Sequence, residues 1–141
     1  MNKKLRYFLF AIIGLGLLLI IGATLFFNAP KASVASISAD YTLSSTELFQ
    51  EYNENQSVAD QKFINKVIEV SGTIFEKSTD QQGATVFILN ADENAGGVLC
   101  TMTLDDTPKV ANKNVGDAIT LKGQCSGMLM EVVLNRCTLV D

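Results

Sequence analysis

The sequence predicts a β-rich α+β protein in which a membrane helix and one amphipathic helix precede a small closed barrel of five strands. Three observations support this prediction. The 141-residue chain has a charge-free apolar run near its start, continues with a helix-capping signature, and ends in short runs of alternating apolar and polar residues separated by turn residues. With the apolar run set aside, the remainder has the length of one domain with a single core.

The apolar run extends from Tyr7 to Phe27 and contains no charged residue. At 1.5 Å per residue, a helix of this length spans the hydrocarbon layer of about 30 Å. Three cations, Lys3, Lys4 and Arg6, precede it. This asymmetry predicts a single-pass protein of the cytoplasmic membrane, with residues 1–6 in the cytoplasm and the C-terminal domain outside, in a periplasmic or other extracytoplasmic space.

The length of the run favours a retained signal anchor, because the apolar core of a cleaved signal peptide has about 7–15 residues. The segment Ser33-Val34-Ala35 has the small-x-small pattern of a cleavage site, so secretion after cleavage near Ala35 remains the alternative. No cysteine follows the run, and a lipoprotein-type attachment is therefore not expected.

Residues 28–43 are small and polar, which predicts a flexible linker. Residues 44–65 predict one amphipathic helix packed on the barrel. It begins with a capping box at Ser44-Ser45-Thr46-Glu47. Its apolar face consists of Leu48, Tyr52, Ala59 and Phe63.

Residues 66–141 predict the barrel. In residues 67–74 the even positions Ile68, Val70 and Ile74 are apolar, and they define the inner face of a first strand. Residues 85–89 form a second strand of ambiguous facing, because all but Thr85 are apolar. A third strand over residues 97–104 alternates again, and its inner positions are Val98, Cys100, Met102 and Leu104.

Residues 105–114, with Pro108 near their start, predict a short helix. Residues 118–123 form a fourth strand and, after a turn at Ser126-Gly127, residues 129–139 form a fifth. The apolar parity changes inside this last strand, which predicts a bulge near Asn135-Arg136.

Three strands, a short helix and two further strands are the element order of an oligonucleotide/oligosaccharide-binding (OB) barrel. Gly72 and Gly123, each isolated and late in a strand, fit the bends that a small barrel needs. An open meander with one helix is the alternative.

Two motifs carry a resemblance to a known family. The spacing of Leu48, Tyr52, Asn55, Ala59, Phe63 and Lys66, followed by residues 67–74, resembles the opening of the tRNA-anti-like family of OB-fold domains. Residues 123–137 resemble its closing signature. The resemblance implies an OB barrel with a leading helix, found in membrane-anchored or exported bacterial proteins. It implies no established activity, since the family name reflects a likeness to anticodon-binding barrels.

The charge distribution argues against nucleic acid as the partner. All 15 acidic residues lie at or beyond Asp40, whereas three of the 11 basic residues precede the apolar run. Phosphate binding requires clustered Lys or Arg, and the remaining cations are dispersed among the acids. On the middle strands Phe87 is the only aromatic residue available to stack a base.

The composition also argues against catalysis. The chain has no His, which excludes Ser-His and Cys-His dyads. Gly-rich phosphate loops, CxxC pairs and metal-ligand spacings are absent from the sequence. We therefore expect no enzymatic activity, no cofactor and no metal.

The three cysteines offer two disulfide pairings in an oxidising compartment. Cys125 and Cys137 flank one turn and form the first candidate pair. Cys100 and Cys137 form the rival pair, because the third and fifth strands are neighbours in an OB barrel. Three buried, reduced thiols remain the third alternative.

The leading functional hypothesis is a non-catalytic, membrane-anchored binding module for an unknown protein, glycan or small molecule. Its candidate binding face, on the second and third strands, consists of Phe87, Leu89, Leu99 and Thr101. The alternative is a structural or assembly accessory of an envelope complex. A nucleic-acid-binding role ranks last.

Overall fold

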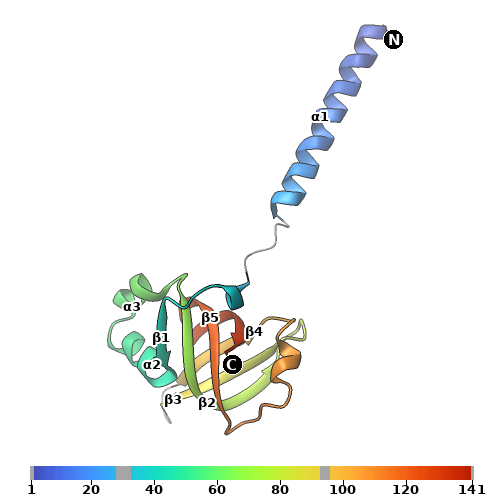
Figure 1. Ribbon diagram of the computed structural model, residues 1–141. Helices are drawn as coiled ribbons and strands as arrows, with labels where there is room; N and C mark the ends of the chain where they lie inside the picture. The colour runs from blue at the N-terminus through green and yellow to red at the C-terminus, as the bar shows by residue number, and fades with distance from the viewer. Residues whose placement is uncertain (1, 28–32, 93–95, 141) are drawn as a thin grey trace. The chain divides into compact units, whose positions relative to one another are not determined.

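The computed structural model describes residues 2–27, 33–92 and 96–140, and the chain divides into two compact units, Met1–Ala32 and Ser33–Asp141 (Figure 1). The first unit contains helix α1 (Lys3–Phe27), in which no residue is buried. Its 25 residues are long and apolar enough to cross a membrane, as the sequence predicts.

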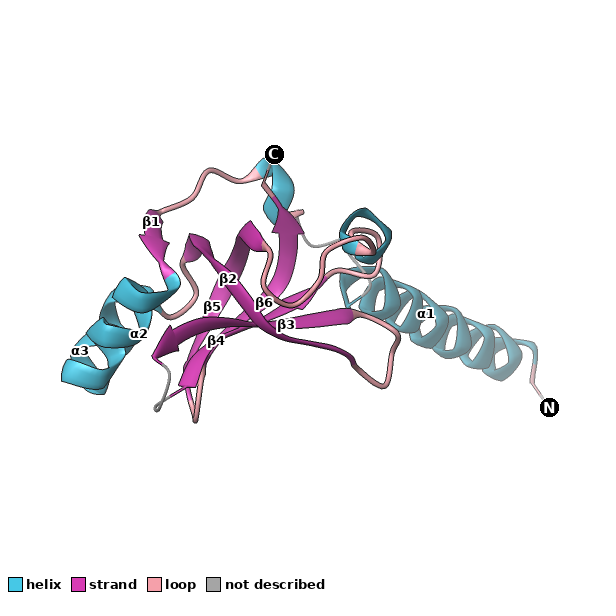
Figure 2. Ribbon diagram, turned by 90° about the horizontal axis from the view of Figure 1, so that it is seen from below, coloured by secondary structure: helices cyan, strands magenta, loops and turns pink. Residues whose placement is uncertain are grey.

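The second unit is a closed barrel built from five strands, with one additional short strand (Figures 1 and 2). Strands β2, β3 and β4 form an antiparallel meander, β6 runs parallel to β4, and β5 pairs with both β6 and β2 to close the barrel. The OB-type order predicted from the sequence is confirmed. The bounds are β2 (Val67–Thr79), β3 (Thr85–Asp92), β4 (Gly96–Met102), β5 (Ala118–Met128) and β6 (Val132–Leu139).

The inner face of the barrel follows the predicted alternation. Ile68, Val70 and Ile74 of β2 are all buried.

Strand β6 contains a bulge opposite β4. Leu134 pairs with Cys100 while Cys137 pairs with Met102, so β6 has one extra residue between these two pairs. Arg136, inside this bulge, has a left-handed φ of 56°. The bulge explains how Leu134 and Cys137, three positions apart, are both buried.

The leading helical segment begins as predicted but is not one helix. Ser44 caps α2 (Ser45–Glu54): its Oγ accepts from the Glu47 amide at 3.2 Å, and its own amide donates to the Glu47 carboxylate at 2.8 Å. The chain then breaks at Asn55, whose backbone is extended and whose side chain accepts from the Val58 amide at the start of α3 (Gln56–Phe63). The predicted single helix over residues 44–65 is therefore wrong, because Asn55 provides an N-cap.

Both helices nevertheless present one continuous apolar face. Leu48 and Tyr52 of α2 and Ala59 and Phe63 of α3 are buried in the core, as predicted. Figures 1 and 2 show α2 and α3 together at one end of the barrel. Asn55, by contrast, is exposed, and its side chain accepts a hydrogen bond from the backbone amide of Val58.

The prediction of a flexible linker over residues 28–43 is wrong for residues 33–43. Residues 28–32 lie outside the described residues, but a 3₁₀ turn, η1 (Val34–Ser36), and a strand, β1 (Tyr41–Ser44), follow them. Strand β1 pairs in parallel with β2, and Asp40 accepts from the Val67 amide at 2.8 Å. One edge of this part of β2 pairs with β5, and β1 supplies hydrogen-bond partners for the backbone groups on the other edge. This pairing is the physical reason why residues 41–44 form a strand.

Three predicted boundaries also shift. The short helix between β4 and β5 is a single 3₁₀ turn, η2 (Thr107–Val110), and its Val110 is buried. Strand β4 ends at Met102, so Leu104 is exposed and does not share the inner face. Strand β5 continues through the predicted turn at Ser126-Gly127, and β6 begins only at Val132.

Lys77 of β2 ties the loop after η2 to the barrel. Lys77 lies opposite Phe87 in the β2–β3 register, with its Nζ 6.0 Å from the ring centroid. The same Nζ donates to the carbonyl oxygens of Ala111 and Lys113, at 3.0 and 2.7 Å. The ammonium group of Lys77 therefore holds the loop after η2 in place through these two hydrogen bonds.

Candidate binding surface

The outer side of β3 and β4 carries a mainly aliphatic surface. Val86 of β3 pairs with Thr101 of β4, and Ile88 pairs with Leu99, so these four side chains share the face opposite the core. Leu99 in turn pairs with Val133 of β6. All five are half-buried. We call these residues, Val86, Ile88, Leu99, Thr101 and Val133, the β3–β4 outer face.

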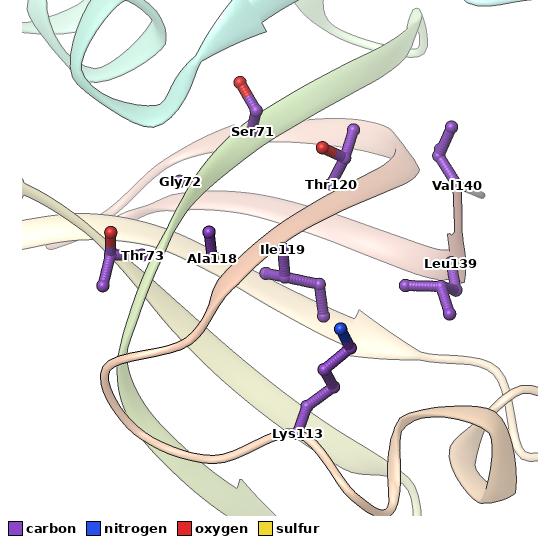
Figure 3. A pocket seen from close by; sticks show the side chains of 9 residues that line it. All are labelled: Ser71, Gly72, Thr73, Lys113, Ala118, Ile119, Thr120, Leu139 and Val140. Atoms are coloured by element: carbon purple, nitrogen blue, oxygen red, sulfur yellow. The ribbon is translucent and has the colours of Figure 1, made fainter.

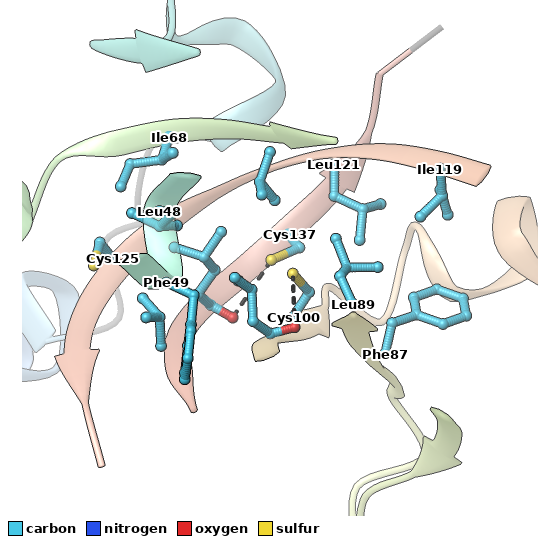
Figure 4. Packing of buried hydrophobic residues seen from close by; sticks show 14 of the residues in the cluster. Leu48, Phe49, Ile68, Phe87, Leu89, Cys100, Ile119, Leu121, Cys125 and Cys137 are labelled. Atoms are coloured by element: carbon cyan, nitrogen blue, oxygen red, sulfur yellow. Dashed lines mark hydrogen bonds between the residues drawn. The ribbon is translucent and has the colours of Figure 1, made fainter. Parts of the chain in front are cut away.

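Two of the four residues predicted for the binding face lie on it. Leu99 and Thr101 belong to the β3–β4 outer face, but Phe87 and Leu89 are 0% exposed and form part of the core (Figure 4). The assignment of Phe87 and Leu89 to the surface is wrong because residues 86–89 are apolar throughout and give no alternation. Sequence reasoning missed Val86, Ile88 and Val133, which only the register of β3 and β6 against β4 identifies.

The β3–β4 outer face lacks the features that bind phosphates or bases. Neither β3 nor β4 contains a Lys or Arg, and their only aromatic residue is the buried Phe87. Two cations of the domain are used within the fold: Lys62 pairs with Glu51 at 2.8 Å, and Lys122 donates to the Ala35 carbonyl at 3.1 Å. The surface is therefore suited to burying apolar area rather than to neutralising charge.

The three cysteines are free thiols, and all are buried. The predicted Cys125–Cys137 disulfide is absent, because the two side chains have different neighbours. Cys125 contacts the Tyr52 hydroxyl at 3.4 Å, whereas Cys137 lies beside Cys100 (Figure 4). The rival Cys100–Cys137 bond is not formed either, although these two thiols are neighbours. Burial, together with Cys100, raises the pKa of Cys137, which keeps this thiol protonated.

The core also holds the hydroxyl of Tyr52, which contacts the Cys125 thiol and has Asp60 in its surroundings. Burial, then the thiol of Cys125, then the carboxylate of Asp60 raise the pKa of Tyr52 far above its ordinary value. A phenol held in this way stays protonated at neutral pH and serves packing. Among the described residues, no three His, Cys, Asp or Glu side chains come together as metal ligands.

The fold and its outer sheet face define an OB-fold domain that follows an N-terminal apolar helix. The chain belongs to the tRNA_anti-like family, whose sequence model matches residues 1–139. No curated protein matches the sequence.

The matches among solved structures include chains from two organisms. A Klebsiella pneumoniae protein described as a "putative nucleic acid-binding lipoprotein" has a TM-score of 0.56 and 19% identity, and the match covers 79% of this chain and 99% of that one. The Stn1-ten1 complex of S. pombe contains a chain with a TM-score of 0.42 and 14% identity, over 52% of this chain and 57% of that one.

Proposed function

We propose that this protein is a non-catalytic binding module, held by α1 on the outer side of the cytoplasmic membrane, which binds a partner protein through the β3–β4 outer face. One observation supports this proposal above the others. The five side chains of this face include four aliphatic residues and no charge, and the exposed Glu76 of β2, paired with Ile88, lies at its edge. An uncharged aliphatic surface gains free energy by excluding water against another apolar surface, which a polypeptide provides better than a glycan or a nucleic acid does.

Nucleic acid is the second candidate, because the Klebsiella neighbour is described as nucleic acid-binding. This role would require cations that release counterions and aromatic rings that stack bases. The β3–β4 outer face has neither. We therefore expect an oligonucleotide to bind weakly at low salt and with no dependence on residues of this face.

Export of the domain is supported by three features. Helix α1 is free of charge from Tyr7 to Phe27, its first residues include the cations Lys3, Lys4 and Arg6, and the structurally similar Klebsiella protein is described as a lipoprotein. A single cysteine introduced by Thr42→Cys, on the exposed side of β1, tests the orientation. A membrane-impermeant maleimide should label it on intact cells or spheroplasts, and labelling only after lysis would contradict export.

Co-purification from solubilised membranes tests the binding face. The full-length chain is compared with Leu99→Asp, which puts a charge in the middle of the β3–β4 outer face. The matched control is Thr42→Asp, which puts the same charge on exposed β1. A partner should be retained by the control and lost from Leu99→Asp. Equal retention by both variants, with both folded, would contradict the assignment of this face.

A further inference from the structure

A hollow of about 530 Å³ lies between the middle of β2, the start of β5 and the end of β6 (Figure 3). It shares no lining residue with the β3–β4 outer face. Its size falls within the range of small-molecule sites, which is roughly 300–1,000 Å³. The hollow is therefore a separate candidate site, and its chemistry differs from that of the aliphatic face.

Three hydroxyl groups line this hollow. Ser71 of β2 lies directly opposite Thr120 of β5, and Thr73 lies opposite Ala118, so both hydroxyl-bearing strands present the same outer face. Among the described residues, none of the three side-chain hydroxyls has a hydrogen-bond partner. Each can donate one hydrogen bond and accept others from a ligand.

An ammonium group completes the polar lining. The backbone of Lys113 is fixed because its carbonyl oxygen accepts from Lys77 at 2.7 Å. Its half-buried side chain extends toward Ile119 and Leu139 (Figure 3). Unlike Lys62, it has no ion-pair partner among the described residues. A partly enclosed cation next to apolar side chains is stabilised by an anion.

We propose that this hollow binds a small oxyanion, a carboxylate or phosphate, on a molecule that also carries hydroxyl groups. The oxyanion pairs with Lys113, and the ligand hydroxyls bond to Ser71, Thr73 and Thr120. The apolar side of the ligand rests on Leu139. A single cation in a chain with 15 acidic residues selects a small anion and repels a polyanion, because repulsion grows with the charge of the ligand.

Titration of the ¹⁵N-labelled full-length protein in detergent micelles tests this site. The probes are glucuronate, inorganic phosphate and, as the uncharged control, glucose. Saturable amide shifts are expected at Gly72, Thr73, Ala118 and Thr120 with an oxyanion and not with glucose. A preference for glucuronate would indicate a sugar acid, and a preference for phosphate would indicate a phosphate ester.

Variants separate a built site from general charge attraction. Lys113→Gln should weaken oxyanion binding at least about tenfold. Lys66→Gln removes the same charge from an exposed position outside the hollow and should leave binding unchanged. Thr120→Val, which leaves the charge intact, should weaken glucuronate binding several-fold. No saturable shift with either oxyanion, or equal loss of affinity in both lysine variants, would overturn the proposal.

Discussion

Gly123 gives the sharpest test of how the barrel core is packed. A Cβ atom at this position would lie 2.5 Å from Sγ of Cys137, 3.2 Å from the Asn135 carbonyl oxygen and 3.2 Å from Cβ of Leu134. Real Cβ atoms do not approach a sulfur so closely. Cys137 is 0% exposed, and its thiol donates to the Leu134 carbonyl at 3.4 Å, so it has little space to move aside.

Gly123→Ala should therefore destabilise the domain by overpacking, by about 1–3 kcal/mol. With a urea m-value of about 1.5 kcal/mol/M, a loss of about 2 kcal/mol lowers the unfolding midpoint by about 1.3 M. The measurement is urea unfolding of the full-length protein in detergent, followed by the far-UV circular dichroism of the sheet.

A double-mutant cycle identifies the clashing atom. Cys137→Ala removes Sγ, so the second substitution should cost clearly less in this background than in the wild type. The expected coupling is about 1 kcal/mol. A Gly123→Ala midpoint within error of the wild type, or strictly additive effects, would refute the packing described here.

Further predictions concern the core, the buried carboxylate and the thiols. Phe87→Ala should cost about 3–5 kcal/mol in urea unfolding because Phe87 is fully buried, whereas Leu104→Ala, at an exposed position, should cost about 0.5 kcal/mol or less. Burial opposes ionisation of Asp106, but hydrogen bonds from Lys109, Thr138 and Thr103 prevail and hold its pKa below the ordinary value. A folded pKa below the unfolded value of about 3.9 gives stability that is present above that pH and is lost as the pH falls through the folded pKa. Asp106→Asn should therefore lower the neutral-pH midpoint and flatten its acid dependence below about pH 4. Alkylation in denaturant without reductant should find all three thiols reactive. If Cys125 and Cys137 were both unreactive, the two would be joined in a disulfide. This result would contradict the packing, because these two side chains have different neighbours.

Local signals in the sequence predicted much of the fold. The Ser44 capping box depends on residues within one turn, and the inner face of β2 follows from alternation in β2 itself. The bulge near Arg136 was visible as a change of parity within one strand. Each of these features is decided by neighbours along the chain.

Features that depend on distant pairing were not predictable. The facing of Phe87 and Leu89 is set by the register of β3 against β4, and strand β1 exists because β2 offers it an edge. The break at Asn55 could not be predicted because the buried residues of α2 and α3 follow one another at the spacing of a single continuous helix. The hollow at Lys113 joins β2, β5 and β6, which no local pattern brings together.

Site-specific photo-crosslinking in intact membranes tests the central claim most directly. A photoreactive amino acid at Ile88, in the middle of the β3–β4 outer face, should form a discrete protein adduct that disappears when Leu99→Asp is added. The same probe at exposed Thr42 should not form this adduct. An adduct to nucleic acid at Ile88, or a protein adduct that is equally strong from Thr42, would contradict the account.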